Sequence, residues 1–94
     1  MTDLERLKRS GYGLAGVGID SYGNEYAMFL KQTRHHRIFI HVFDDRSTYI
    51  ELDGVEKRGD IVGTAKKAIA YGERYLAEKA AERRAEKKEK RDVQ

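Results

Sequence analysis

Apolar and polar residues alternate with a period of two through the middle of the chain, which is typical of β-strands with two different faces. Residues 38–43 give the clearest signal because they are rich in β-branched and aromatic side chains. Weaker patterns of the same kind predict strands at residues 14–19, 26–32 and 48–52. The connections are short, so we expect neighbouring strands to pair as an antiparallel meander.

A helical pattern follows the last predicted strand and a polar loop at residues 53–59. It starts near Asp60, with Thr64 as an alternative start of its well-ordered part, and it extends to about residue 91. Its early apolar residues fall on one stripe of the helix, which is expected to face a core. These residues are Ile61, Ala65, Ala68, Ile69, Gly72 and Leu76.

A shorter helix is predicted from residue 3 to about residue 9, because Thr2 and Glu5 have the spacing of a capping box. The 94 residues therefore predict one α+β domain, an antiparallel three- to four-stranded β-meander packed on one long C-terminal helix, with a short N-terminal helix. We assign residues 1–76 to the compact domain and residues 77–94 to a charged, Ala-rich helical extension. The predicted long helix of about 45 Å exceeds the width of such a domain, which is about 30 Å.

The two faces of the predicted sheet differ in composition. With an assumed register, one face is aliphatic and is expected to lie under the long helix: Val17, Ile19, Met28, Leu30, Ile38, Ile40, Val42, Ile50 and Leu52. The other face holds all three phenylalanines and forms a predicted interface of Phe29, Phe39, His41, Phe43 and Tyr49. This aromatic face is buried by a homodimer or by the N-terminal helix, stacks unpaired bases, or contacts another protein.

The chain is mildly basic, with a net charge of +3 and a pI of about 9.2, which is compatible with binding to nucleic acid. One basic cluster lies at a predicted hairpin and contains Lys31, Arg34, His35, His36 and Arg37. A second is the pair Lys66 and Lys67, near a helix start whose free N–H groups are suited to phosphate. Both clusters are candidate sites that contact phosphates or an acidic protein surface. The alternative is that neither cluster has a binding role, and that the first is a solvated turn and the second a solvated helix end.

The motifs that carry chemistry do not indicate an enzyme. Residues 11–16 match the pattern G-x-G-x-x-G, but no predicted strand precedes them and no predicted helix follows, so a dinucleotide site is not expected. His35 and His36 point to opposite sides of an extended strand, and the serines lack the nucleophile-elbow motif. We therefore expect no catalytic residue, no metal and no cofactor.

Two features of the composition bear on the compartment. The chain has no cysteine, and it has neither a signal-like segment nor an apolar run of the roughly 18 residues that a membrane span needs. A cytoplasmic protein with no membrane contact is expected.

The order of elements, with His35 ahead of Phe39 and with Lys66 and Lys67 leading into an Ala-rich helix, resembles the double-stranded RNA-binding domain over residues 26–76. Ala70 replaces the third lysine of that family's helix, and Thr-Arg precedes His35 where the family has Gly-Pro. The resemblance implies that Lys66, Lys67 and His35 contact phosphates and the minor groove.

The predicted function is a small non-enzymatic binding module that contacts nucleic acid or a protein that handles nucleic acid. The alternative is a small protein-binding inhibitor or adaptor, of the size and kind of the phage-encoded anti-defence proteins such as anti-CRISPR proteins.

Overall fold

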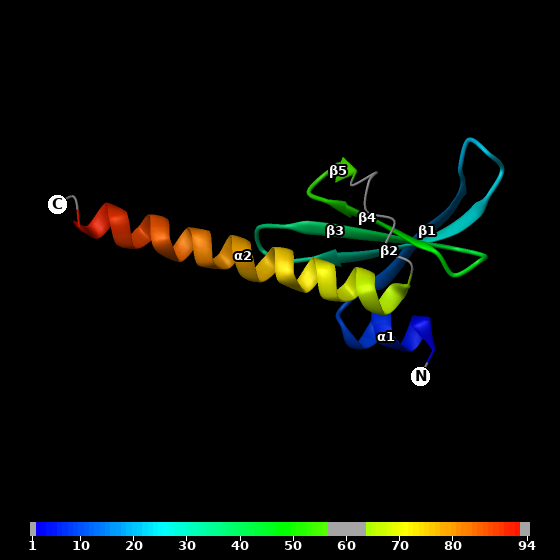
Figure 1. The fold of residues 1–94 in the computed structure, drawn as a ribbon, viewed down its shortest axis with the longest axis horizontal. Coiled ribbons are helices and arrows are strands. Elements are labelled where there is room, and N and C mark those ends of the chain that lie inside the picture. The colour runs from blue at the N-terminus through cyan, green and yellow to red at the C-terminus, as the bar shows by residue number, and fades with distance from the viewer. Residues whose placement is uncertain (1, 57–63, 93–94) are drawn as a thin grey trace.

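The computed structural model describes residues 2–56 and 64–92 of the chain and confirms the predicted α+β class. Within these residues, five strands form one sheet, and two helices lie on the same side of it (Figure 1). The elements follow in chain order as α1 (Asp3–Arg9), β1 (Gly13–Ile19), β2 (Glu25–Gln32), β3 (Arg37–Phe43), β4 (Thr48–Leu52), β5 (Val55–Glu56) and α2 (Ala65–Asp92).

The sheet is the predicted antiparallel meander with one strand added. Its spatial order is β1-β2-β3-β4-β5, so each strand pairs with its neighbour in sequence. The added strand β5 lies in the segment that was expected to be a polar loop, and residues 57–59 of that loop lie outside the described residues. A tight turn makes this pairing possible, because Asp53 and Gly54 both adopt positive φ angles, of 53° and 82°.

The short helix α1 is capped as the sequence predicted. The hydroxyl of Thr2 accepts a hydrogen bond of 3.2 Å from the backbone N–H of Glu5, which satisfies one of the free donors at the helix start. The helix ends at Ser10, and Gly11 follows with a φ of 90°. The left-handed residue turns the chain directly into β1, so α1 folds back against the sheet.

The long helix α2 is described from Ala65, and Thr64 occupies the capping position. The Thr64 hydroxyl accepts a hydrogen bond of 3.3 Å from the N–H of Lys67, and its carbonyl accepts one of 3.1 Å from the Thr48 hydroxyl. This end of the helix is therefore fixed at the start of β4. The expected start at Asp60, together with Ile61, lies outside the described residues.

Helix α2 is much longer than the sheet that it covers. Its 28 residues span about 42 Å, whereas the longest strand, of 8 residues, spans about 27 Å. The C-terminal part of the helix accordingly extends past the sheet (Figure 1). The division after residue 76 falls inside this continuous helix, and it stays a prediction.

The core lies between the helices and one face of the sheet, which we call the covered face. Ile40 of β3 lies opposite Phe29 of β2 and Ile50 of β4, and all three side chains are buried. Both helices contribute to this core: Leu7 from α1, and Ala68 and Ile69 from α2. Gly72 permits the close approach of α2, because a Cβ at this position would lie 2.8 Å from the hydroxyl of Tyr12.

The observed register corrects the predicted faces in β2. Phe29 and Lys31 lie on the covered face, opposite Ile40 and Ile38, whereas Met28 and Leu30 lie on the other, uncovered face. A shift of one residue exchanges every side chain of a strand between the faces, and β2 is apolar on both sides, so its pattern did not fix the register. The assignment of Phe29 to an exposed interface was wrong, because its side chain is 7% exposed and belongs to the core.

Candidate nucleic-acid interface

The β2–β3 turn and the second half of α2 together line a groove of about 360 Å³, which we call the basic groove. Arg34 and His35 come from the turn, and the helix contributes residues with the spacing i, i+3, i+4 and i+7, which share one helical face. The helix residues are Ala80, Arg83, Arg84 and Lys87. Five of the six described residues that line it are arginine, lysine or histidine, so the groove is suited to an anion.

The turn is held by the side chain and backbone of Thr33. The Thr33 hydroxyl accepts a hydrogen bond of 3.0 Å from the His36 N–H, and the Thr33 N–H donates one of 2.9 Å to the His36 carbonyl. This compact turn leaves the side chains of Arg34 and His35 exposed at its tip. The two residues therefore reach the groove without forming part of the core.

His36 connects the turn to both the sheet and the helix. Its Nδ1 lies 2.7 Å from the carboxylate of Asp53, and its Nε2 lies 2.6 Å from Nη1 of Arg83. Because Asp53 only accepts, Nδ1 carries the proton of the neutral ring, and Nε2 accepts from the Arg83 guanidinium. This arrangement fixes Arg83 in the wall of the basic groove.

Asp53 is the anchor of this network. Its second carboxylate oxygen accepts a hydrogen bond of 2.8 Å from the N–H of Arg37, and the Tyr75 hydroxyl donates one of 2.5 Å to the oxygen that also faces His36. Desolvation raises the pKa of Asp53, but the hydrogen bonds from Tyr75, Arg37 and His36 outweigh it and lower the pKa to about 2. The hydrogen bond to Asp53, together with desolvation, raises the pKa of Tyr75 to about 12. Asp53 is thus ionised at neutral pH, and its carboxylate is hydrogen-bonded to His36, Arg37 and Tyr75.

The remaining cations of the groove are available for a ligand. Among the described residues, Arg34, Arg84 and Lys87 form no ion pair. Desolvation, followed by the charges of Arg83 and Arg34 and of neighbouring basic groups, lowers the pKa of His35. These positive charges disfavour the protonated form of His35, and the negative charge of a bound phosphate would oppose this effect.

Of the predicted basic hairpin, only Arg34 and His35 line the groove; Lys31 and Arg37, like His36, do not. Lys31 extends over the ring of Tyr12, with its Nζ 5.7 Å from the ring centroid, so it contacts the N-terminal segment instead. Arg37 donates a hydrogen bond of 3.0 Å from its Nε to Gln32. With Arg34 and His35, Arg37 lines a second hollow beside the turn, which also contains Phe39.

The predicted phosphate contacts Lys66 and Lys67 lie at the other end of the molecule. They occupy the first turn of α2, which is joined to β4 through Thr48. Arg83 follows Lys67 by sixteen residues, a separation of about 24 Å along the helix. The structure therefore does not bring Lys66 and Lys67 together with Arg34 and His35 in one site.

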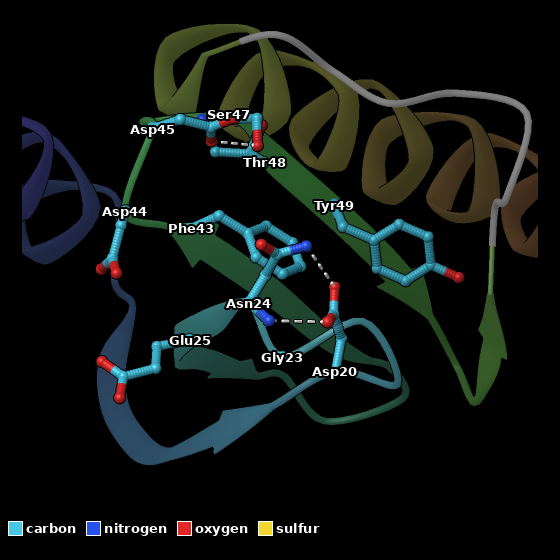
Figure 2. Close-up of a pocket in the computed structure, with 10 residues that line it drawn as sticks. All are labelled: Asp20, Gly23, Asn24, Glu25, Phe43, Asp44, Asp45, Ser47, Thr48 and Tyr49. Atoms are coloured by element: carbon cyan, nitrogen blue, oxygen red, sulfur yellow. Dashed lines mark hydrogen bonds between the residues drawn. The ribbon is translucent and has the colours of Figure 1, made fainter.

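Acidic residues also gather at this other end of the sheet. Figure 2 shows the hollow there, which four acidic residues line: Asp20 of the β1–β2 turn, Glu25 at the start of β2, and Asp44 and Asp45 of the β3–β4 turn. The turns use two of these groups for local hydrogen bonds. Asp20 accepts from the N–H groups of Tyr22 and Asn24 at 2.9 and 2.8 Å, and Asp45 accepts from Ser47. Four acidic residues thus lie at the end of the sheet where Lys66 and Lys67 also lie.

A row of rings lies on the uncovered face of the sheet. Phe39, His41, Phe43 and Tyr49 of the predicted interface are all there and are partly exposed. Sequence reasoning missed Tyr26, which stacks on His41 with centroids 4.8 Å apart. Gly18 makes room for it, because a Cβ there would lie 2.6 Å from the Tyr26 hydroxyl. We call these five aromatic residues the aromatic row.

Sequence reasoning also missed the helical wall of the groove. Arg83, Arg84 and Lys87 belong to the predicted charged, Ala-rich extension of residues 77–94, where seven lysines and arginines are mixed with five acidic residues. The available signal was the stripe that these residues form with Ala80. That stripe faces the turn, and Glu82 and Glu86 are not among the residues that line the groove.

Two further structural findings concern other kinds of site. In residues 2–56 and 64–92, no group of three or more histidine, aspartate or glutamate side chains is placed to hold a metal ion. No helix in the same part of the chain is long and apolar enough to cross a membrane. Comparison of the chain with family models, with curated proteins and with solved structures found no match.

Proposed function

We propose that the protein is a small non-enzymatic module that binds nucleic acid, with the phosphate backbone lying in the basic groove. The observation that carries this proposal is the convergence of Arg34 and His35 from the turn with Arg83, Arg84 and Lys87 from the helix. No acidic residue of the described chain lines the groove, so no carboxylate in the lining neutralises its positive charges. Arginine is the side chain best suited to contact phosphate oxygens in pairs.

The position of the acidic turns supports the same proposal. The carboxylates of the β1–β2 and β3–β4 turns lie at the opposite end of the sheet from the groove. A polyanion is repelled by these carboxylates and attracted by the cations of the basic groove, which favours contact at the groove. A module of this kind binds through phosphates in a sequence-independent way.

The aromatic row favours a single strand as the ligand. Phe39 shares a hollow with Arg34 and Arg37, so the row begins where the basic turn ends. An extended single strand that follows the groove onto the uncovered face places its bases against these rings. A duplex cannot offer base faces to the row, and it would contact the basic groove alone.

Binding measured at several salt concentrations tests the proposal. We expect a labelled single strand to bind the chain with a log–log salt slope of about −0.7 for each phosphate neutralised. Duplex RNA and duplex DNA serve as parallel ligands, and Phe39→Ala should remove any preference for the single strand. Absence of binding to all three ligands at low salt would contradict the proposal.

The same groove is also suited to an acidic protein surface, which is the rival function of an inhibitor or adaptor. A pull-down from a lysate with and without nuclease separates the two. Loss of every partner after nuclease treatment supports direct binding to nucleic acid. A partner protein that is retained after nuclease treatment, but is no longer captured by the Arg84→Ala variant, supports the rival.

A further inference from the structure

Strand β1 is an apolar edge of the sheet. Its aliphatic side chains are strongly exposed, at 67% for Leu14, 79% for Val17 and 64% for Ile19. The strand stands at the end of the sheet order, so in the described part of the chain no other strand pairs with its outer side. Edge strands of monomers normally carry charges or proline that prevent pairing, whereas β1 has the sequence GLAGVGI.

The exposed side chains of β1 continue into a groove beside α1. The groove has a volume of about 850 Å³, and its apolar wall includes Leu4, Val17, Ile19, Ala27 and Val42. An apolar edge and an apolar groove on the same side of the sheet form one continuous surface. Contiguous apolar surface of this kind marks a contact site.

The charges that flank β1 indicate which partner fits. Lys8 and Arg9 stand in the last turn of α1, just before the strand, and the Lys31 side chain lies beside Gly11. At the other end of β1, Asp20 follows the strand and Glu25 lies opposite Ile19. The edge therefore has a basic end and an acidic end with an uncharged strand between them.

We propose that β1 pairs antiparallel with β1 of a second copy of this chain. The antiparallel arrangement places the basic end of each strand against the acidic end of its partner, whereas a parallel one would oppose like charges. It joins the two sheets into one and brings Leu14, Val17 and Ile19 of both copies together across a two-fold axis. The two basic grooves then lie at opposite ends of the joined sheet.

This dimer differs from the predicted one and is independent of nucleic-acid binding. The predicted homodimer used the aromatic face, whereas β1 pairing leaves the aromatic row uncovered. The inference rests on the β1 edge and its flanking charges, and it makes no use of the basic groove.

Sedimentation velocity from micromolar to submillimolar concentration tests the proposal. We expect the wild-type chain to sediment as a dimer of two 10.8 kDa chains. The double variant Val17→Lys/Ile19→Lys should be a monomer over the same range, because it places charges along the edge. Val55→Lys is the matched control, since Val55 is 59% exposed on the opposite edge strand, and it should remain a dimer.

Two further measurements address the arrangement and the fold. Glu25→Lys should weaken the dimer, because it places a lysine against the basic end of the partner strand. Circular dichroism should show the same secondary structure in all variants, because the substituted side chains are exposed. Hydrogen exchange of alternate β1 amides should slow as concentration rises.

Three outcomes would overturn the proposal. A wild-type chain that is monomeric at every concentration excludes self-pairing and leaves the edge to a different protein. A dimer that survives the double lysine substitution places the contact on another face, such as the aromatic row. If Glu25→Lys strengthens the dimer, the two β1 strands do not pair in the antiparallel direction that we propose.

Discussion

Nη1 of Arg83 lies 2.6 Å from Nε2 of His36, although 47 residues separate them in the chain. This contact joins the second half of α2 to the β2–β3 turn, the two elements that line the basic groove. Asp53 holds the opposite nitrogen of the same ring, so the imidazole is oriented from both sides. The groove is therefore organised before any ligand arrives.

Replacing His36 should loosen this junction. His36→Ala removes the hydrogen bonds to Asp53 and Arg83 from a side chain that is only 13% exposed. We expect the free energy of unfolding to fall by about 1–3 kcal/mol, as measured by urea denaturation. The matched control is His35→Ala, whose exposed ring should change stability by less than about 0.5 kcal/mol. Equal effects of the two substitutions would show that the His36 hydrogen bonds do not support the fold.

Two pairs of basic residues distinguish the basic groove from the site predicted from sequence. Arg84→Ala/Lys87→Ala and Lys66→Ala/Lys67→Ala each remove two positive charges from α2. We expect only the first pair to flatten the salt dependence of binding, by about 0.7 in slope for each phosphate of a single strand that is no longer neutralised. Fluorescence anisotropy at several salt concentrations measures this. A larger effect of Lys66 and Lys67 would move the site to the start of α2.

Ile40→Asp tests the position of the core. Ile40 is fully buried beneath the helices, so an aspartate there is a buried charge with no partner. We expect the free energy of unfolding to fall by more than about 4 kcal/mol, which is enough to unfold a domain of this size. Circular dichroism with thermal melting measures the effect. Tyr22→Asp is the control, because Tyr22 is exposed in a turn. The melting temperature of this variant should be close to that of the wild type.

Asp53 should make stability depend on pH in the acid range. Its pKa is lowered from 3.8 to about 2 in the folded chain, so its contribution is fully present above 3.8 and is lost as the pH falls through about 2. Asp53→Asn removes this contribution. The difference in stability between wild type and variant, measured by urea denaturation, should therefore be constant near neutral pH and shrink toward pH 2. A difference that does not shrink in acid would show that the carboxylate charge is not involved.

The sequence by itself determined the elements and their order. The β-branched run of β3 and the capping box at Thr2 are local signals, and the predicted and observed bounds of α1 and of β1 to β4 agree within one residue. Such signals act between residues close in sequence, where backbone geometry and local hydrogen bonds decide the outcome. The meander followed from them, because short turns leave antiparallel pairing as the simplest connection.

Only the tertiary structure decided which face each side chain of β2 occupies and which basic residues meet. Phe29 and Met28 are both apolar, so either side chain could belong to the core. The pairing of Phe29 with Ile40 places Phe29 on the covered face and Met28 on the uncovered face. Arg83 reaches the β2–β3 turn because α2 starts beside Thr48 of β4 and runs the length of the sheet. The direction of a rigid helix, which is fixed at its other end, sets that contact. The stripe that contains Arg83 marks one face of the helix, but it does not say which turn that face meets.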